Sequence, residues 1–336
     1  MKFYPNIIHV DITDECNLQC IHCRVVKRER RLSFRFIDLK KVFQDVSNYK
    51  SGNLKWVSIG GGEPLKVTWL LDLIKYLKDL GVNILLTTNG TLVTRKVAEI
   101  LFAAGLTRVQ VSLDGVCQET HDKIRGKGTF EKAIRAIHFF QDSGIEVTLR
   151  MTLTSYNFHE VEDFVKVGKE LGVISVSCRK LIPVGRGLAN QNMLDIPIPV
   201  YRNILQKLPG LEEKYQIRVS SGDPLAIVAN QKLLKHIDQE WGLDNVITGC
   251  TPGISYLYIS PDGFVKPCPM IDVKLGDLKT ASIWEIWETA NFYNRIRNRS
   301  SSKCVACRYR FVCGGCRAAA YANCGDYFGI DPNCWF

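Results

Sequence analysis

Three cysteines near the start of the chain have a spacing that suits metal chemistry. Cys16, Cys20 and Cys23 follow a C-x3-C-x2-C pattern, just after the apolar run Ile7–Thr13 that we expect to form a strand. Three thiolates on one short loop can hold three corners of a cubane iron–sulfur cluster, which leaves the fourth iron free to bind a small molecule. Ferredoxin patterns differ, because they supply four cysteines per cluster. The alternatives are a zinc site, for which paired Cys or His spacings are typical, and three unconnected thiols.

A second group of cysteines lies toward the end of the chain. Its eight members are Cys250, Cys268, Cys304, Cys307, Cys313, Cys316, Cys324 and Cys334. Eight thiolates are the number that two fully ligated cubane clusters need. A zinc ribbon is the alternative, but only five residues separate Cys307 from Cys313, which is short for its usual two knuckles. Such clustering favours metal binding over disulfides in a cytoplasmic chain.

The composition indicates an ordinary globular protein. The chain has 336 residues, enough for about two domains, and is 46% hydrophobic and 23% charged. We expect a cytoplasmic protein, because there is no membrane-spanning apolar run and no signal peptide at the start. The net charge is +10. The basic stretch 27–31 is either a solvated loop or a surface that attracts an acidic partner, such as a flavodoxin, or an anionic substrate. No nucleic-acid-binding motif is present, so nucleic acid is not an expected partner.

Strand-like and helix-like segments alternate as far as residue 182, which predicts an α/β fold with a parallel sheet in six units. The expected strands are Ile7–Thr13, Trp56–Gly60, Asn83–Thr88, Arg108–Asp114, Ile145–Leu153 and Val173–Ile182. The expected helices are Phe36–Tyr49, Thr68–Leu80, Val93–Ala104, Phe130–Asp142 and His159–Leu171.

The rest of the chain is less regular. We expect a helix at Val200–Leu208 that Pro209 and Gly210 end, and another at Leu225–His236. The segment Ile259–Val265 predicts a strand, a tight turn and a strand, and Ser282–Arg297 predicts a helix. Our boundaries are a barrel at 1–187, a helical linker at 188–245 and a cysteine-rich domain at 246–336.

Polar motifs follow the expected strands, where parallel strands place functional residues. Gly60-Gly61-Gly62-Glu63-Pro64 follows the second strand, and Asn89 follows the third. Glycines let a backbone approach a ligand closely, and Pro64 suits the start of a helix. A bare strand–helix turn would explain the glycines and the proline but not Glu63. Asn89-Gly90 alone is a common turn, and its place at a strand end favours a site.

The fourth and fifth strands alternate apolar and polar residues, so one face should pack under helices and the other should line the cavity. The cavity-facing set includes Ser112 and Asp114 on the fourth strand and Arg150 on the fifth. A cavity-facing Arg150 needs an anion, since an unpaired buried charge is costly. The anion is either a bound carboxylate or a neighbouring Asp or Glu, and Arg125 competes for the same role.

The cysteine triad, with Gly61-Gly62-Glu63-Pro64 about 40 residues downstream, resembles the motifs of radical S-adenosylmethionine (SAM) enzymes. Two positions depart from the common pattern, since His22 replaces a frequent Tyr or Phe and Arg24 a frequent Tyr. Neither changes the ligand set. The resemblance implies a partial (β/α)6 TIM-like barrel, which matches the six units. It also implies that the open iron chelates the amino and carboxylate groups of SAM.

The resemblance further suggests SAM contacts. It implies that the Gly-Gly-Glu motif contacts the SAM amino group, with Asn89 nearby. Ser112 is a candidate for the SAM carboxylate or ribose, and Arg125 or Arg150 for the carboxylate. For Asp114 and His121, a role in ordering the loop by local hydrogen bonds is favoured as much as a contact with SAM.

Residues 250–336 resemble the SPASM domain, which holds two auxiliary 4Fe–4S clusters in some radical SAM enzymes. The resemblance therefore implies three clusters in all. It suggests that one auxiliary cluster is bound by Cys304, Cys307, Cys313 and Cys334. The other is suggested at Cys250, Cys268 and Cys316. The pair Cys313 and Cys316 departs from the family pattern, because its spacing is C-x2-C rather than C-x3-C. The fourth ligand of the second cluster is therefore either Cys324 or absent, and in the latter case the fourth iron stays open for substrate.

The implied reaction is reductive cleavage of SAM to a 5′-deoxyadenosyl radical, which takes hydrogen from a substrate. The expected substrate is a ribosomal peptide or protein side chain that is crosslinked, epimerised or oxidised. The alternative is a tetrapyrrole side chain in haem-type biosynthesis, and a more remote one is an iron–sulfur electron-transfer protein. A flavodoxin or ferredoxin would supply electrons. Since the triad begins at position 16, a separate protein would bind any peptide leader. No catalytic acid or base is evident.

Overall fold

The computed structural model describes residues 3–25, 35–48, 54–299 and 304–336. The basic stretch 27–31 and Tyr49, at the end of the first expected helix, lie outside the described residues. Within the part of the chain that is described, no helix is both long enough and apolar enough to cross a membrane.

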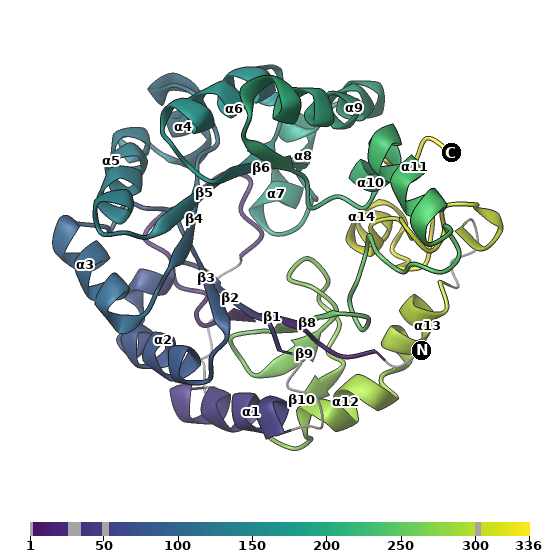
Figure 1. Ribbon diagram of the computed structural model, residues 1–336, viewed down its shortest axis with the longest axis horizontal. Helices are drawn as coiled ribbons and strands as arrows, with labels where there is room; N and C mark the ends of the chain where they lie inside the picture. Colours follow the sequence, from purple (N-terminus) through teal and green to yellow (C-terminus); the bar gives the residue numbers. More distant parts are fainter. Residues whose placement is uncertain (1–2, 26–34, 49–53, 300–303) are drawn as a thin grey trace.

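One curved sheet of ten strands forms the centre of the described structure, in the order β10-β9-β8-β1-β2-β3-β4-β5-β6-β7 (Figure 1). The strands are β1 (Ile7–Asp11), β2 (Trp56–Gly60), β3 (Asn83–Thr88), β4 (Arg108–Ser112), β5 (Glu146–Leu153), β6 (Ser175–Lys180), β7 (Arg218–Ser220), β8 (Tyr256–Ile259), β9 (Phe264–Lys266) and β10 (Gly276–Asp277). Neighbours from β8 through β1 to β7 are parallel, whereas β9 and β10 pair antiparallel. The predicted parallel α/β barrel is confirmed.

Helices cover the outside of this curved sheet (Figure 1). The helices of the barrel are α1 (Phe36–Asn48), α2 (Leu70–Asp79), α3 (Arg95–Ala104), α4 (Gln118–Arg125), α5 (Thr129–Asp142) and α6 (Val161–Glu170). The later helices are α7 (Arg186–Ala189), α8 (Gln191–Leu194), α9 (Ile198–Tyr215), α10 (Leu225–Ala229), α11 (Gln231–Glu240), α12 (Ile283–Thr289), α13 (Asn291–Arg297) and α14 (Arg317–Cys324).

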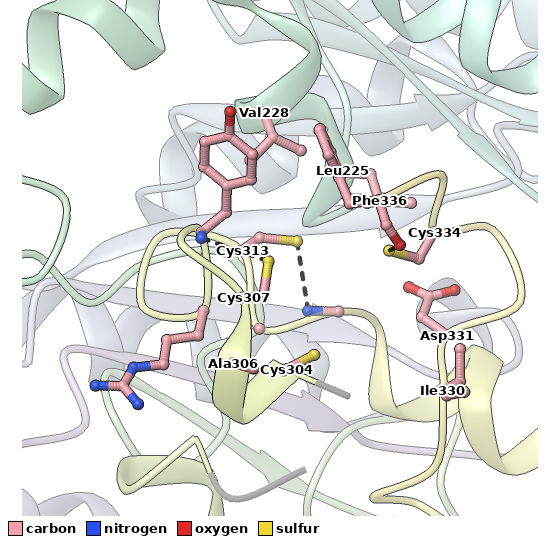
Figure 2. Close-up of a pocket in the computed structure, with 14 residues that line it drawn as sticks. Leu225, Val228, Cys304, Ala306, Cys307, Cys313, Ile330, Asp331, Cys334 and Phe336 are labelled. Atoms are coloured by element: carbon pink, nitrogen blue, oxygen red, sulfur yellow. Dashed lines mark hydrogen bonds between the residues drawn. The ribbon is translucent and has the colours of Figure 1, made fainter. Parts of the chain in front are cut away.

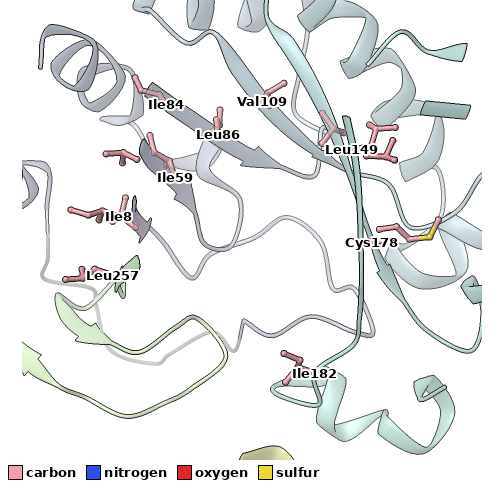
Figure 3. Packing of buried hydrophobic residues seen from close by; sticks show 14 of the residues in the cluster. Ile8, Ile59, Ile84, Leu86, Val109, Leu149, Cys178, Ile182 and Leu257 are labelled. Carbon is pink, nitrogen blue, oxygen red and sulfur yellow. The ribbon is translucent and has the colours of Figure 1, made fainter. Parts of the chain in front are cut away.

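The predicted alternation gives the sheet one apolar face toward the helices and one polar face toward the inside of the partial barrel. Val109, Val111 and Leu113 are fully buried, whereas Gln110 and Ser112 on the opposite face remain partly exposed. Figure 3 shows the same apolar layer along other strands, with side chains directed toward the helices. Full burial of each such aliphatic side chain contributes about 1.5–3 kcal/mol, so the outer layer holds the sheet while the inner face is free for polar residues.

Three predictions for the later helices are wrong. Helix α9 does not end at Pro209, because it continues to Tyr215. Leu208 and Leu211 lie on its buried side, which packs against α6, and this burial offsets the hydrogen bond that proline cannot make. The helix expected at 225–236 is two helices, since the Asn230 side chain accepts a hydrogen bond from Leu233 N–H and starts α11. The helix expected at 282–297 likewise breaks, at the extended residue Ala290.

Both ends of the sheet are extended by segments beyond the six predicted units. Strand β7, which the sequence did not suggest, pairs with β6. The expected strand–turn–strand is confirmed as β8 and β9, with Gly263 at a φ of +85° in the turn. Strand β8 also pairs with β1 in the register Ile7 to Tyr256, which no local pattern indicated. The sheet therefore includes strands from all three segments that we delimited.

Candidate functional site

The loop that carries Cys16, Cys20 and Cys23 is fixed by the glycine loop after β2. Gly62 N–H donates to Thr13 O and Glu63 N–H donates to Glu15 O, both at 2.8 Å. A Cβ atom on Gly62 would lie 2.0 Å from Glu15 O, a distance that no real contact allows. The glycine therefore lets this loop approach the backbone of the cysteine loop, a reason that the sequence did not reveal.

Glu63 joins the glycine loop to the end of β3. Its fully buried carboxylate accepts hydrogen bonds from Thr88 Oγ1 at 2.8 Å, Asn89 N–H at 2.8 Å and Leu65 N–H at 3.2 Å. Burial raises the pKa of Glu63, while the donor from Asn89 lowers it. Asn89 in turn points its Nδ2 at Asn17 Oδ1, 3.0 Å away, on the cysteine loop. Glu63 and Asn89 thus orient the loops, with the glutamate oxygens already occupied by these donors.

A second buried carboxylate, Asp114, holds the other side of the cysteine loop. Its Oδ2 accepts from Arg125 Nε at 2.6 Å and lies 3.2 Å from His22 Nε2. Burial lowers the pKa of His22 to about 4, so this imidazole is neutral at pH 7. Arg125 Nη1 also lies 4.0 Å from Cys20 Sγ, close to the thiol rather than free in the barrel. His121 Nδ1 accepts from Asp114 N–H at 3.1 Å, the loop-ordering bond expected of this pair.

A third carboxylate, Asp11, was not among the expected site residues. It receives both guanidinium nitrogens of Arg24, at 2.7 and 2.9 Å, the Tyr258 hydroxyl at 2.7 Å, and it lies 2.9 Å from His9 Nε2. Burial alone would raise the pKa of Asp11, but the Arg24 charge and the His9 hydrogen bond hold it well below its usual range. Strand alternation places His9 and Asp11 on the inner face, which is the signal that could have found them. Tyr258 lies 247 positions from Asp11, beyond any local pattern.

Arg150 lies inside the barrel in register with Ser112 on β4 and Ser177 on β6. Among the described residues, no side chain or carbonyl forms a hydrogen bond or ion pair with its guanidinium. Burial, together with the nearby charges of Arg179 and Arg24, lowers the pKa of Arg150 to about 10, so Arg150 is still a cation at pH 7. The sequence left two partners open for Arg150, a bound carboxylate and a neighbouring Asp or Glu side chain. No Asp or Glu side chain of the described residues lies at bonding distance from its guanidinium.

Four cysteines of the C-terminal group surround one cavity. Cys304, Cys307, Cys313 and Cys334 line a space of about 270 Å³ together with apolar side chains from α10 and the chain end (Figure 2). One water needs only about 10–15 Å³, so this space suits a larger group. Burial raises the pKa of the Cys313 thiol well above its ordinary value. The four thiols are the set that the family resemblance suggested for one auxiliary cluster.

A separate group consists of Cys250, Cys268 and Cys316. Burial raises the pKa of Cys268 to about 11 and that of Cys316 further, and the nearby Cys250 adds to both shifts. Cys324 is not brought to this group. It is exposed at the end of α14, where its thiol donates to Ala320 O at 3.3 Å. Cys316 caps the start of the same eight-residue helix, which places the two cysteines about 12 Å apart along its axis.

The donor chemistry of both C-terminal groups fits iron–sulfur clusters. Three buried arginine nitrogens, Arg179 Nε, Arg299 Nε and Arg317 Nη2, have no hydrogen-bond partner among the residues that the structure describes. Buried donors are normally satisfied, and anionic sulfur would satisfy these. Within the described residues, no three His, Cys, Asp or Glu side chains converge closely enough to share one metal ion. A cubane binds each cysteine to a different iron, which is compatible with this wider spacing.

Comparisons with known proteins match both halves of the chain. A family model of the Radical SAM superfamily matches residues 10–167, and one of the iron–sulfur cluster-binding SPASM domain matches residues 250–314. The chain is 30% identical to the AdoMet-dependent heme synthase of Methanosarcina barkeri, over 98% of this chain and 96% of that protein. It is 28% identical to the mycofactocin maturase MftC of Mycobacterium tuberculosis, over 98% of this chain and 83% of the maturase. The fold matches Streptococcus suis SuiB bound to S-adenosylmethionine, with a TM-score of 0.78, 17% identity, and coverage of 99% of this chain and 78% of SuiB.

Proposed function

Because the chain belongs to the radical SAM superfamily, in the subgroup of enzymes with a SPASM domain, we propose that it modifies the side chains of a tetrapyrrole in haem-type biosynthesis. The observation that carries this proposal is the similarity to the heme synthase, which extends over nearly the full length of both proteins. The barrel interior supports it, because the unpaired guanidinium of Arg150 suits the carboxylates of such a substrate or of SAM.

Enzymes of this subgroup bind SAM and 4Fe–4S clusters, and we assign the SAM-binding cluster to Cys16, Cys20 and Cys23. Reductive cleavage of SAM at that cluster supplies the 5′-deoxyadenosyl radical. Gly61, Gly62, Glu63 and Pro64 form the loop that would contact the SAM amino group, and Asn89 ties that loop to Cys16. Ser112 and Arg150, in register on neighbouring strands, would contact the SAM carboxylate. Arg125 contributes positive charge next to Cys20, held in place by Asp114.

We assign two auxiliary clusters to the C-terminal region, which makes three in all. Cys304, Cys307, Cys313 and Cys334 would hold one around their shared cavity. Cys250, Cys268 and Cys316 would hold the other, with its fourth position open because Cys324 lies apart. Iron analysis tests the count, since three cubanes require about 12 iron atoms per chain. We further propose a flavodoxin or ferredoxin as electron donor, which the net charge of +10 would attract.

The substrate proposal is tested by an anaerobic reaction of the iron-loaded protein with dithionite, SAM and iron coproporphyrin III. We expect 5′-deoxyadenosine together with a change in the mass of the porphyrin, measured by chromatography and mass spectrometry. A protein with Cys16 replaced by Ala is the control and should give neither product. Formation of 5′-deoxyadenosine without any change in the tetrapyrrole would contradict the substrate but not the radical chemistry.

A second candidate is modification of a peptide or protein side chain, supported by the 28% identity to the mycofactocin maturase. In that case a separate leader-binding protein would present the peptide. The same assay with a Cys- or Tyr-bearing precursor peptide, with and without such a protein, distinguishes the two. Modified peptide with unchanged porphyrin would favour this candidate over the first.

A further inference from the structure

Arg179 connects the inside of the barrel to the C-terminal cysteines. It stands on β6, paired with Thr152 of β5, and its Nη2 donates a hydrogen bond to Cys316 Sγ at 3.0 Å. The two residues lie 137 positions apart in the chain. The guanidinium of Arg179, on a strand of the barrel, thus bonds directly to a cysteine that we assign to an auxiliary cluster.

The guanidinium of Arg179 is charged and only partly satisfied by hydrogen bonds. An arginine guanidinium stays protonated in proteins, so this side chain is a permanent cation. Asp223 does not bond to it, because the Asp223 carboxylate accepts from the Tyr201 hydroxyl at 2.9 Å and from Leu225 N–H at 2.9 Å. Arg179 Nε is buried with no acceptor. The guanidinium charge therefore lies next to the Cys316 sulfur, and one further donor, Nε, is not used by the described residues.

We propose that Arg179 is a positioning residue that raises the reduction potential of the auxiliary cluster bound by Cys316. This inference rests on the proposed function, in which Cys250, Cys268 and Cys316 hold a cluster. Hydrogen bonds to cluster sulfur, net charge and burial set the potential of iron–sulfur sites. A fixed cation that donates to a ligand sulfur stabilises the reduced form more than the oxidised form, because the reduced form carries one more negative charge.

The position of Arg179 indicates what a higher reduction potential would do for the reaction. Its side chain lies beside Arg150, whose charge interacts with it inside the barrel. The auxiliary cluster that Cys316 would help to hold therefore adjoins the inner face of the barrel, which carries both Arg179 and Arg150. A higher potential favours transfer of one electron from a substrate-centred radical to that cluster, which becomes reduced by one electron.

The competing explanation is that Arg179 only fastens the C-terminal region to the barrel. The potential separates the two, because a fastening residue would change stability or iron content without shifting the cluster's electron affinity. The measurement is an anaerobic redox titration followed by electron paramagnetic resonance. It uses the full chain with Cys16, Cys20 and Cys23 replaced by Ala, so that only the auxiliary clusters contribute.

Three variants are compared in that background. Arg179→Met removes the charge and the donors at similar length, and Arg179→Lys keeps the charge but loses the planar fork. Arg218→Met removes a charge from the exposed, neighbouring strand β7 and serves as the control. We expect Arg179→Met to lower the electron affinity of one cluster about tenfold, which is about 59 mV for a one-electron couple. Arg179→Lys should shift it less, and Arg218→Met and the other cluster should not change.

Iron content keeps the outcomes distinct. The background protein should hold about eight iron atoms; about four would contradict the two-cluster assignment itself rather than the role of Arg179. Unchanged potentials in fully loaded Arg179→Met would overturn the inference. Loss of iron in both Arg179 variants would also overturn it, because the residue would then hold the cluster instead of tuning it.

Discussion

The two cysteine regions of this molecule are held in place by different means. The loop with Cys16, Cys20 and Cys23 is bonded on several sides by the barrel: Arg186 Nε donates to Cys20 O at 2.9 Å, and Asn190 Nδ2 donates to Ile21 O at 2.9 Å. The C-terminal cysteines instead lie mostly on short turns and loops, before β8, after β9 and after α13. There, the buried guanidinium of Arg299 bonds the carbonyls of Cys250 and Thr248.

This difference indicates which of the two cysteine sites is already shaped by the fold before iron binds. The first loop is shaped by strand ends whose apolar faces form the core, so its geometry follows from the fold. The second region has little regular structure, and among the described residues two of its buried arginine nitrogens, Arg299 Nε and Arg317 Nη2, lack acceptors. Binding of a cluster would satisfy them and add folding free energy, as metal binding does in other small domains.

The largest expected effect comes from removing one ligand in each region. Cys20→Ala should abolish formation of 5′-deoxyadenosine, because two ligands cannot hold the SAM-binding cluster in working geometry. Cys307→Ala should keep part of the 5′-deoxyadenosine formation but lose the modified product. Both yields are measured in the dithionite assay. Full turnover of substrate by Cys307→Ala would count against a working role for that cluster.

The next largest effect should come from the removal of iron, which should change hydrogen exchange differently in the two regions. After anaerobic chelation, we expect amide hydrogen exchange to become faster over residues 304–336 and to change little over residues 15–25. Strand β4 is the internal control, because its apolar residues are fully buried. Equal loss of protection in both regions would mean that iron shapes both sites to the same extent.

Asp114 tests how strongly the barrel holds the first loop. Asp114→Ala leaves the buried Arg125 without its partner, so we expect a loss of about 3–5 kcal/mol in the free energy of unfolding. Denaturant titration of the iron-free protein measures this. The matched control is Asp142→Ala, whose partner Arg95 is 57% exposed and whose loss should cost at most about 1 kcal/mol. Similar values for the two variants would contradict a buried anchor.

The smallest expected change concerns the glycine loop. Gly62→Ala would bring a methyl group against Glu15 O, and we expect a loss of about 1–3 kcal/mol as the loops separate. Gly210→Ala is the control, because a Cβ atom there meets nothing within 4 Å inside α9. That variant should stabilise the protein by about 0.5–1 kcal/mol. A Gly62→Ala protein as stable as the parent would show that the loops can move apart freely.

The amino-acid sequence by itself determined the fold class, the polar inner face of the barrel and the place of the cysteine loop. These features are local or periodic: apolar and polar residues alternate along β4 and β5, and the triad follows a strand directly. The grouping of Cys304, Cys307, Cys313 and Cys334 was also anticipated, although from a family resemblance rather than from spacing alone.

Only the tertiary structure decided which distant residues meet. Tyr258 reaches Asp11, Arg179 reaches Cys316, and Cys324 stays apart from Cys316, because strand pairing and helix length set those distances. The continuation of α9 through Pro209 is of the same kind, since burial against another helix outweighs a local preference. Long-range contacts of this sort depend on the summed packing of the whole chain, which no short stretch of sequence records.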